Sequence, residues 1–461
     1  MSMSINCDVL VVGGGISGIA AAMELHKSGK KVLLAEARGY LGGAIRTVED
    51  SGYLLEMGPN SMMLGTEDPI NVWLDQLGLS GNLLKASPDS QNRYVWIRGK
   101  LFPAPLSPSS FLTTPLFSLR EKIRVAQELF IPQGSGLPDG SDETVGHFVR
   151  RRLGDGFLEK LIDPFVKGVY ASHPDLLSVE SAFPLLSKLE KEHGGLIRGA
   201  IHLSRTKRRK GMPLSGPSGG LYSFPGGLGE MVRAFSGYLN DDSLIHAELT
   251  EWHRLPSGGF KCVLLQEDEA IEVVCKKMIL ATSPSDAARI LEKNHPELAS
   301  VLFSIPMAPV AIAYVGVARE ALPGYSPGFG VLFPTSEKRK VLGIIQSSDL
   351  FPNRSPEGKV LLTVFAGGML SPKIAMSFDE DFEAIILGEL NAVFGLKVKP
   401  EFFRIQRWAE GISQYSPGHA LRIEKIRSLT PEGVFLAGNY LGGISVSKTF
   451  SNGVEAARSS L

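Results

Sequence analysis

The chain contains few cysteines. Only Cys7, Cys262 and Cys275 occur among 461 residues, and no two of them form a C-x-x-C motif. Secreted proteins that depend on disulfides use cysteine more heavily, and zinc and redox sites usually space their cysteines closely. This cysteine usage favours a reduced, cytoplasmic compartment. No metal site is expected, because the histidines are also isolated from other metal-binding residue types.

An excess of charge of one sign is also missing. Lysine plus arginine and aspartate plus glutamate both number 48, so the formal net charge is zero. A protein that binds nucleic acid through its phosphates normally carries a clear basic excess. Nucleic acid is therefore not expected as a partner.

Long apolar runs that could cross a membrane are missing as well. Two uncharged stretches, 101–119 and 301–318, approach the required length. Four prolines interrupt the first and would break a helix, while the β-branched and small residues of the second are typical of a buried strand. We expect neither a transmembrane helix nor a signal peptide. The expected location is cytoplasmic, and peripheral contact with the inner face of a membrane stays open.

A glycine-rich motif dominates the N-terminal part of the chain. An apolar run, 9–12, is followed by Gly13-Gly14-Gly15-Ile16-Ser17-Gly18 and an alanine-rich stretch, which is the order strand, tight turn, helix. Gly13 permits the turn, Gly15 lets the backbone approach a pyrophosphate, and Gly18 lets the helix pack closely on the strand. The free N–H groups of the helix N-terminus suit the phosphates.

A second expected strand, 31–35, ends in Glu36, which follows Gly18 by 18 residues. A carboxylate at this place can accept hydrogen bonds from both ribose hydroxyls and would repel a 2′-phosphate. The motif therefore predicts an adenine dinucleotide other than NADP.

The residues after Glu36 distinguish FAD from NAD. Gly42-Gly43-Ala44 and the later run 56–61, with Gly58-Pro59, resemble the second glycine pair and the Gly-Pro turn of the amine-oxidase-like FAD superfamily. In that superfamily the backbone approaches the diphosphate, the ribityl chain and the isoalloxazine edge at these positions. The resemblance implies FAD.

The expected fold is α/β, similar to p-hydroxybenzoate hydroxylase and the amine oxidases, with a discontinuous Rossmann-like FAD-binding domain, a mixed-sheet substrate-binding domain and a helical insertion. Apolar and alternating runs predict strands at 247–255, 259–267 and 270–282, a second sheet from 308–319, 328–334, 341–347 and 360–367, and a late parallel strand at 434–439 before a C-terminal helix. The expected segments are 1–65, 222–295 and 405–461 for the FAD-binding domain, 66–92 and 296–404 for the substrate-binding domain, and 93–221 for the helical, membrane-associating insertion.

Three further blocks, 161–168, 350–356 and 435–446, resemble the oxygen-dependent protoporphyrinogen oxidases, and the similarity extends over nearly the whole chain. Composition and spacing alone indicate only an FAD oxidoreductase. The resemblance implies oxidation of protoporphyrinogen IX to protoporphyrin IX in haem or chlorophyll biosynthesis, with hydride transfer to flavin N5, O2 as the acceptor and release of H2O2. The chemistry takes place on the flavin, so no catalytic residue is assigned with certainty.

The resemblance also implies partners. FAD is expected to bind non-covalently, because the C-terminal segment lacks the cysteine to which monoamine oxidases attach their flavin. Protoporphyrinogen IX and O2 are the expected substrates, and contact with a membrane, transfer of the product to ferrochelatase and a homodimer are open.

The resemblance assigns substrate-binding roles to six residues. Arg93 would pair with a propionate, Leu332 and Ile345 would sandwich one ring, and Phe365 would stack on the opposite ring. The carbonyl of Gly168 would approach the pyrrole N–H groups, and Asn60 would contact both substrate and cofactor. From pattern alone, Arg93 is an ordinary hairpin arginine and the three apolar residues are ordinary core residues.

The chain departs from the family pattern directly after Gly168. A further glycine pair and an aspartate are usual there, whereas this chain has Val169-Tyr170-Ala171-Ser172-His173. This wall of the substrate pocket is therefore expected to have a different shape.

The expected cofactor-binding residues lie in all three segments of the FAD-binding domain. They are Gly13, Gly15, Ile16, Ser17, Gly18, Glu36, Ala37, Arg38, Gly42, Gly43, Ala44, Gly58, Pro59, Asn60, Ser61, Leu249, Trp408, Gly438, Asn439, Ile444, Ser445 and Val446.

Three alternatives stay open. A coproporphyrinogen III oxidase of the same family should present more basic side chains at the mouth of the pocket, because its substrate carries four carboxylates instead of two. An amine oxidase should have an aromatic cage and would not need Arg93. A flavin-free binding protein similar to the Rab GDP-dissociation inhibitors would keep the fold without the cofactor.

Overall fold

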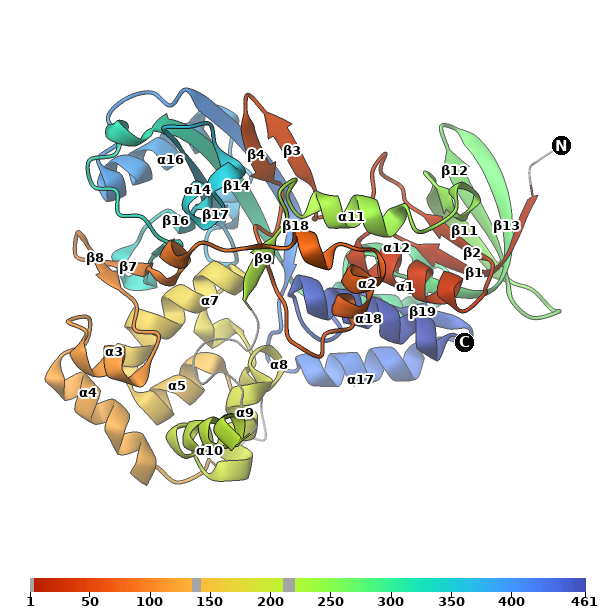
Figure 1. Ribbon diagram of the computed structural model, residues 1–461. Helices are drawn as coiled ribbons and strands as arrows, with labels where there is room; N and C mark the ends of the chain where they lie inside the picture. Colours follow the sequence, from red (N-terminus) through yellow and green to blue (C-terminus); the bar gives the residue numbers. More distant parts are fainter. Residues whose placement is uncertain (1–3, 135–141, 210–219) are drawn as a thin grey trace.

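The computed structural model describes residues 4–134, 142–209 and 220–461. Figure 1 shows two lobes, each built on a β-sheet, with a helical region below the second lobe. The expected α/β class is confirmed.

The first lobe contains a seven-stranded sheet in the order β10-β2-β1-β13-β12-β11, with β19 also beside β13. Its strands are β1 (Ser4–Val12), β2 (Val32–Ala35), β10 (Leu244–Ile245), β11 (Glu248–Arg254), β12 (Phe260–Gln266), β13 (Glu269–Leu280) and β19 (Val434–Leu436). The central strands are parallel, whereas β11 and β12 are antiparallel to their neighbours. Because β13 pairs with both β1 and β12, the three strands expected at 247–282 join the nucleotide-binding sheet.

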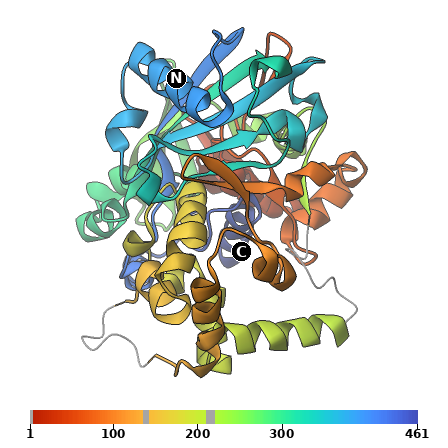
Figure 2. The same cartoon turned by 90° about the vertical axis from the view of Figure 1, so that its left-hand side faces the viewer.

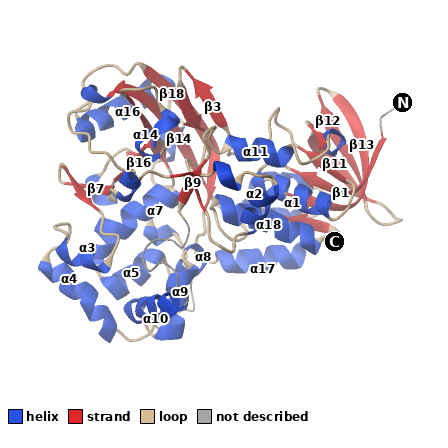
Figure 3. Ribbon diagram, viewed as in Figure 1, coloured by secondary structure: helices blue, strands red, loops and turns tan. Residues whose placement is uncertain are grey.

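Helices cover both faces of this sheet (Figure 3). Val9 and Val11 of β1 face one hydrophobic cluster and Leu10 faces the other, as the alternation of a strand buried on both sides requires. The first face packs on α1 (Ile16–Lys27), α2 (Pro69–Gln76), α11 (Gly229–Ser236) and α18 (Val446–Ser459), and the second on α12 (Pro284–Glu292), α13 (Pro296–Phe303) and α17 (His419–Leu429).

The second lobe contains a mixed seven-stranded sheet in the order β18-β14-β17-β16-β15-β7-β8. Its strands are β7 (Arg93–Ile97), β8 (Lys100–Pro103), β14 (Met307–Ala318), β15 (Gly330–Leu332), β16 (Val341–Gln346), β17 (Lys359–Gly367) and β18 (Phe402–Ser413). Phe382, Ile386 and Leu390 of α16 (Asp379–Phe394) pack on one face. The other face lies against α7 (Asp163–Tyr170).

Several elements lie in a different lobe from the domain segment in which the sequence places them. The hairpin of β7 and β8, expected in the insertion, joins the second sheet through parallel pairing of β7 with β15. The first part of the expected FAD segment 405–461 lies in β18, also in the second sheet. In contrast, Ile70 and Trp73 of α2, expected in the substrate-binding domain, pack in the core of the first lobe. These pairings are long-range, so local pattern could not reveal them.

The expected buried strand 301–318 is shorter than predicted. Strand β14 begins at Met307, and residues before Ser304 belong to the end of α13. Pro306 cannot donate a ladder hydrogen bond and stands just before the strand, which accounts for the later start.

The helical region lies below the second sheet (Figures 1 and 2). It contains α3 (Pro108–Thr113), α4 (Leu119–Ala126), α5 (Val145–Leu153), α6 (Asp155–Phe157), α7, α8 (Val179–Ala182), α9 (Pro184–His193) and α10 (Leu196–Arg209). Within the described ranges, no helix combines the length and the apolar character needed to cross a bilayer.

The described residues also form smaller elements. They are the hairpin of β3 (Thr47–Asp50) and β4 (Tyr53–Glu56), the short strands β5 (Met62–Met63), β6 (Leu84–Lys85) and β9 (Leu221–Ser223), and the short helices α14 (Ser347–Leu350) and α15 (Pro372–Ala375).

Candidate active site

The first glycine turn has the geometry that the motif predicts. Gly13 has a φ of 103°, and a Cβ there would lie 2.7 Å from the carbonyl oxygen of Ala281. A Cβ on Gly18 would collide with the carbonyl oxygen of Gly13, so helix α1 packs against the turn at this point. A Cβ on Gly15, in contrast, would have no atom within 4 Å. The turn is therefore tightly packed behind Gly13 and Gly18 and open in front of Gly15.

Glu36 lies beside this turn. It is 7% exposed, and its carboxylate accepts hydrogen bonds from the backbone N–H of Gly14 at 2.6 Å and of Arg38 at 2.8 Å. A carboxylate held by two backbone donors has a fixed position. The structure thus brings Glu36 to the glycine turn, as the prediction of a ribose-binding acid requires.

The second glycine pair lies directly against the first. The N–H of Gly42 donates to the carbonyl of Gly14 at 2.7 Å, and a Cβ on Gly43 would be 3.2 Å from the Cα of Gly15. A Cβ on Gly58 would in turn collide with the carbonyl of Ala44. The segments around Gly15, Gly43 and Gly58 therefore form one continuous strip of exposed backbone, along which an extended molecule can lie.

The end of β19 and the start of α18 provide a second turn beside this strip. Gly438 has a φ of 152°, and the side chain of Asn439 accepts a hydrogen bond from Ser413 at 2.7 Å. Ser445 caps α18 by accepting a hydrogen bond from the N–H of Lys448 at 3.3 Å, with Val446 as the first helical residue. Ile444 packs against the core of the helical region. Helices α1 and α18 touch, since a Cβ on Gly453 would collide with the carbonyl of Ser17.

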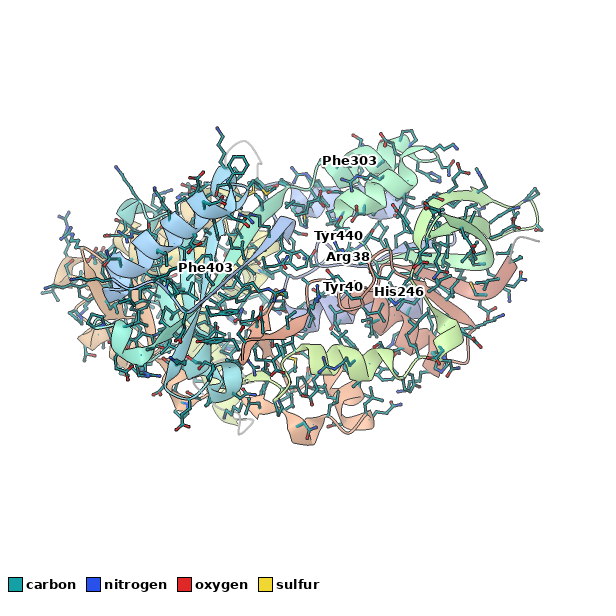
Figure 4. All side chains as sticks on the ribbon, turned by 90° about the horizontal axis from the view of Figure 1, so that it is seen from above. Arg38, Tyr40, His246, Phe303, Phe403 and Tyr440 are labelled. Atoms are coloured by element: carbon teal, nitrogen blue, oxygen red, sulfur yellow. The ribbon has the colours of Figure 1, made fainter. Side chains whose placement is uncertain are left out.

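The remaining residues expected to bind the cofactor range from exposed positions to the core of the first lobe. The indole N–H of Trp408 donates to the carbonyl of Met57 at 2.7 Å, and the guanidinium of Arg38 lies 6.0 Å from its ring. Figure 4 shows Arg38, Tyr40 and His246 near the middle of the molecule, between the two lobes. Ala37 is exposed, Pro59 and Ser61 are half-buried, and Leu249 is a core residue of the first lobe. Ile16 is buried at the start of α1.

These residues fit a dinucleotide with a flavin. The open position at Gly15 accommodates a group that approaches the backbone closely, and the N-terminus of α1, with its unpaired N–H groups, begins there. The strip continues past Gly43 and Gly58, next to Met57, whose carbonyl accepts the hydrogen bond of Trp408. The expected roles of the individual residues stay predictions.

The four side chains expected to hold the substrate lie on one face of the second sheet. Tyr94, Val331, Ile344 and Val364 point to the core that contains α16. Their neighbours Arg93, Leu332, Ile345 and Phe365 therefore point to the opposite face, where each is half-buried.

Two glycines lie among these side chains. Gly330 of β15 lies in register between Arg93 and Ile345, and Gly343 of β16 lies between Leu332 and Phe365. A Cβ on Gly343 would be 3.1 Å from Cδ2 of Leu332, so the side chain of Leu332 lies close over this glycine. Helix α7 closes this region, because a Cβ on Gly168 would lie 2.5 Å from Cδ2 of Leu332. The structure thus brings together Arg93, Gly168, Leu332, Ile345 and Phe365.

Arg93 is the charged group of this face. Its Nε atom is buried and has no hydrogen-bond partner among the described residues, and its guanidinium lies 4.8 Å from the ring of Phe329. Burial lowers the pKa of Arg93 from its ordinary value. A half-buried guanidinium whose Nε lacks a hydrogen-bond partner is partly desolvated, and a ligand carboxylate would satisfy it.

Asn60 connects the cofactor strip to the substrate face. Its side chain donates to the carbonyl of Gly58 at 3.3 Å and accepts a hydrogen bond from Ser347 at 3.2 Å. Ser347 is in turn 2.7 Å from the hydroxyl of Thr363, which stands two residues before Phe365 and on the same face.

Sequence reasoning missed two polar residues of the site. Thr363 could have been found, since residues two apart on a strand share a face. Tyr415 gave no such signal. Its hydroxyl donates to the carbonyl of Asn439 and accepts a hydrogen bond from the N–H of Gly443 at 2.6 Å, which fixes the turn before α18.

Comparison with known proteins agrees with this geometry. The model of the family described as flavin containing amine oxidoreductase matches residues 16–459. A chloroplastic protoporphyrinogen oxidase of Oryza sativa subsp. japonica is 32% identical over 477 residues, which cover 98% of this chain and 88% of the relative. A coproporphyrinogen III oxidase of Bacillus subtilis (strain 168) is 29% identical over 472 residues, which cover 98% of this chain and 97% of that protein.

Among solved structures, a protein from Exiguobacterium sp. 255-15, provisionally named protoporphyrinogen oxidase, has a TM-score of 0.81. Its sequence identity is 22%, and the match covers 100% of this chain and 98% of that one. At this identity the match shows the fold alone, and it confirms the predicted architecture. The flavin predicted from the glycine motifs is confirmed by the family. The chain therefore belongs to the flavin-containing amine oxidoreductase family.

Proposed function

We propose that the protein is an FAD-dependent porphyrinogen oxidase that converts protoporphyrinogen IX to protoporphyrin IX with O2 as acceptor and release of H2O2. The observation that carries this proposal is the half-buried guanidinium of Arg93 at the edge of an apolar sheet face, because its buried Nε atom has no hydrogen-bond partner among the described residues. An apolar macrocycle with a carboxylate complements such a face, because the rings cover Leu332, Ile345 and Phe365 while the carboxylate pairs with Arg93.

The chain's own residues bind and orient the substrate. Bound flavin supplies the two-electron chemistry, so the protein needs no strong acid or base of its own. Leu332, Ile345 and Phe365 exclude water from the rings, and Gly168 lets α7 approach them without a side chain. The hydrogen bonds from Gly58 through Asn60 and Ser347 to Thr363 hold the cofactor strip and the substrate face in a fixed relation.

The test is anaerobic mixing of the purified protein with protoporphyrinogen IX and, separately, with coproporphyrinogen III. Flavin absorbance should bleach with protoporphyrinogen IX, and porphyrin fluorescence should develop when air is admitted. Failure of both porphyrinogens to bleach the flavin would refute the proposal. A protein that purifies without flavin would instead support a flavin-free binding protein.

Coproporphyrinogen III is the second candidate substrate. The similarity to the Bacillus subtilis protein named coproporphyrinogen III oxidase covers 98% of this chain. Faster bleaching by coproporphyrinogen III than by protoporphyrinogen IX would establish this alternative. An amine oxidase is less well supported, because a neutral amine would leave Arg93 without a partner.

The proposed location is the cytoplasm, with contact to a membrane through the helical region. The three cysteines are free thiols in the structure, which suits a reducing compartment. Large apolar side chains on α3, α4 and the turn after α4 are exposed, among them Leu112 at 68%, Leu119 at 74% and Phe130 at 84%. Exposed apolar groups that gather in one region suit insertion at a lipid surface.

Two further partners are proposed on the family resemblance alone. They are ferrochelatase, which would receive the porphyrin, and a second copy of this chain in a homodimer.

A further inference from the structure

A basic pocket of about 270 Å³ lies beside the substrate face. Lys167, Lys338, Arg339 and Lys340 contribute to its lining, together with Thr335, Ser371 and Ser172. No acidic side chain occurs among the described residues that line it. Leu342, another lining residue, belongs to the same hydrophobic cluster as Phe365, so the pocket begins where the substrate face ends.

Lys167 is a mostly buried residue of this lining. It is only 6% exposed, and it forms no hydrogen bond or ion pair with any described residue. Burial lowers the pKa of Lys167 from its ordinary value, while Asp163 and Glu389 act in the opposite direction. An anion in the pocket would stabilise the charged ammonium group.

Both neighbouring carboxylates are engaged by other groups. Asp163 accepts hydrogen bonds from the N–H and the hydroxyl of Thr335 at 2.5 and 2.8 Å. Glu389 lies 2.7 Å from Nε of Arg339 and accepts a hydrogen bond from the N–H of Lys340 at 3.0 Å. Arg339 is paired with Glu389, and Lys338 and Lys340 are exposed and form no ion pair with any described residue, so their charges remain available to a ligand.

A second buried group in the lining is also unsatisfied. Ser172 is 1% exposed, and its hydroxyl has no hydrogen-bond partner among the described residues. A buried hydroxyl of this kind normally finds a partner. The ammonium group of Lys167 and the buried hydroxyl of Ser172 line the same pocket, and together they form a donor pair that matches an anion with two oxygens.

The pocket and Arg93 stand at opposite ends of the substrate face. Three inter-strand steps separate β7, which carries Arg93, from β17, which contributes Gly367 to the pocket. Thr363 of β17 is in register, across β16 and β15, with Arg93 of β7. Gly367 lies four residues further along β17 than Thr363. At ordinary strand spacing the two backbone positions are on the order of 15–20 Å apart. Only a large ligand can therefore reach both cations.

We propose that the pocket around Lys167 and Ser172 binds a carboxylate group. Two sources carry this chemistry: a second carboxylate of the macrocycle whose first carboxylate pairs with Arg93, which rests on the proposed function, and a small free carboxylate. The first source would favour a substrate with carboxylates on both sides of the ring system, such as coproporphyrinogen III, over one with carboxylates on one side.

The test compares two stable porphyrins on the flavin-loaded protein. Coproporphyrin III and protoporphyrin IX are titrated against the unmodified protein, Lys167→Met and Ser172→Ala, and dissociation constants are read from porphyrin fluorescence. Lys167→Met should weaken the binding of coproporphyrin III about tenfold more than the binding of protoporphyrin IX, since it removes one charge-assisted hydrogen bond. Ser172→Ala should act in the same direction and more weakly. Lys397→Met removes an exposed lysine elsewhere and is the matched control.

A second arm tests the free carboxylate. If citrate raises the melting temperature of the unmodified protein and not that of Lys167→Met, while both porphyrins bind the two proteins alike, the pocket takes a free carboxylate. Equal porphyrin selectivity and equal citrate response in the two proteins would overturn the proposal. Ser172→Ala carries the same test if Lys167→Met does not retain its flavin and near-ultraviolet circular dichroism.

Failure of this proposal differs from failure of the proposed function. One outcome would refute only the proposed carboxylate site. In that outcome a porphyrinogen bleaches the flavin of the unmodified protein, but Lys167→Met changes neither the porphyrin selectivity nor the citrate response. The opposite outcome would refute only the proposed oxidase function. In that outcome neither porphyrinogen bleaches the flavin, but the citrate response of the unmodified protein is lost in Lys167→Met.

Discussion

The carboxylate of Glu56 lies 3.7 Å from the guanidinium of Arg354, and both side chains are almost completely buried. Glu56 ends β4, directly before the cofactor strip, whereas Arg354 follows α14 in the second lobe. Glu56 also accepts hydrogen bonds from the N–H of Leu228 at 2.8 Å and from Thr47 at 2.7 Å. This buried pair joins three distant segments around the strip.

Replacing Glu56 with glutamine should change how stability depends on pH. Burial raises the pKa of Glu56 from 4.5 to about 7, so the folded protein binds this proton more tightly than the unfolded chain. The associated stability is present below pH 4.5 and is lost as the pH rises to about 7, up to about 3 kcal/mol. Glu56→Gln should remove this part of the fall in the free energy of unfolding, measured with urea between pH 4.5 and 7.5. Parallel pH profiles for the two proteins would contradict the raised pKa.

Two glycines of the first turn should separate cofactor binding from folding. Gly15→Ala should fold normally and lose flavin, because its methyl group meets no protein atom and occupies the space in front of the turn. Gly18→Ala should lower the free energy of unfolding by about 1–3 kcal/mol, because its methyl group collides with the carbonyl of Gly13. The measurements are the flavin-to-protein absorbance ratio and the melting temperature of the flavin-free proteins. Full flavin content in Gly15→Ala would exclude this position as the phosphate site.

The features that the sequence predicts well are local. Gly13, Gly15 and Gly18 show their roles by spacing, and the apolar runs in 328–367 predict the strands, whereas the shared face of Leu332, Ile345 and Phe365 is visible only in the structure. Features that depend on long-range pairing could not be predicted. The hairpin that carries Arg93 gives no local indication that β15 pairs beside it.

The electrostatic features of the site were equally hidden in the sequence. Whether an arginine or a lysine has a partner depends on residues far away in the chain. Arg354 lies 3.7 Å from the buried carboxylate of Glu56, whereas Arg93 and Lys167 form no ion pair with any described residue, and no pattern in their neighbours distinguishes them. Unpartnered cations therefore emerge only from the structure, and these two lie at opposite ends of one sheet face.

The alanine substitutions of Phe365 and Phe382 should lower the free energy of unfolding by clearly different amounts. Phe365 is half-buried on the proposed substrate face, while Phe382 is fully buried on the opposite face of the same sheet. Phe382→Ala should cost about 3–5 kcal/mol of unfolding free energy, as expected for a core phenylalanine. Phe365→Ala should cost clearly less and should lower turnover with porphyrinogen. Equal losses of stability would mark Phe365 as an ordinary core residue.

Gly168→Ala should disturb the substrate face without affecting the flavin. Its methyl group would lie 2.5 Å from Cδ2 of Leu332 and would displace that side chain. We expect an increase in KM of about tenfold, since a displaced apolar wall reduces the contact with the rings. Flavin content should stay the same. Combining this change with Leu332→Ala removes the collision and should restore part of the affinity, and no recovery would show that Leu332 is not the contact that matters.

Arg93→Ala should separate substrate binding from stability. KM for a porphyrinogen should rise about tenfold to a hundredfold, because a charge-assisted hydrogen bond to a carboxylate is lost, while flavin content is unchanged. The free energy of unfolding should change little, because Arg93 is half-buried, its Nε has no hydrogen-bond partner among the described residues, and the substitution removes only its contact with the ring of Phe329. Arg98→Ala, which changes an exposed arginine at the turn of the same hairpin, is the control and should alter neither quantity. Unchanged KM, or a large loss of stability in Arg93→Ala, would show that this arginine supports the fold and does not bind substrate.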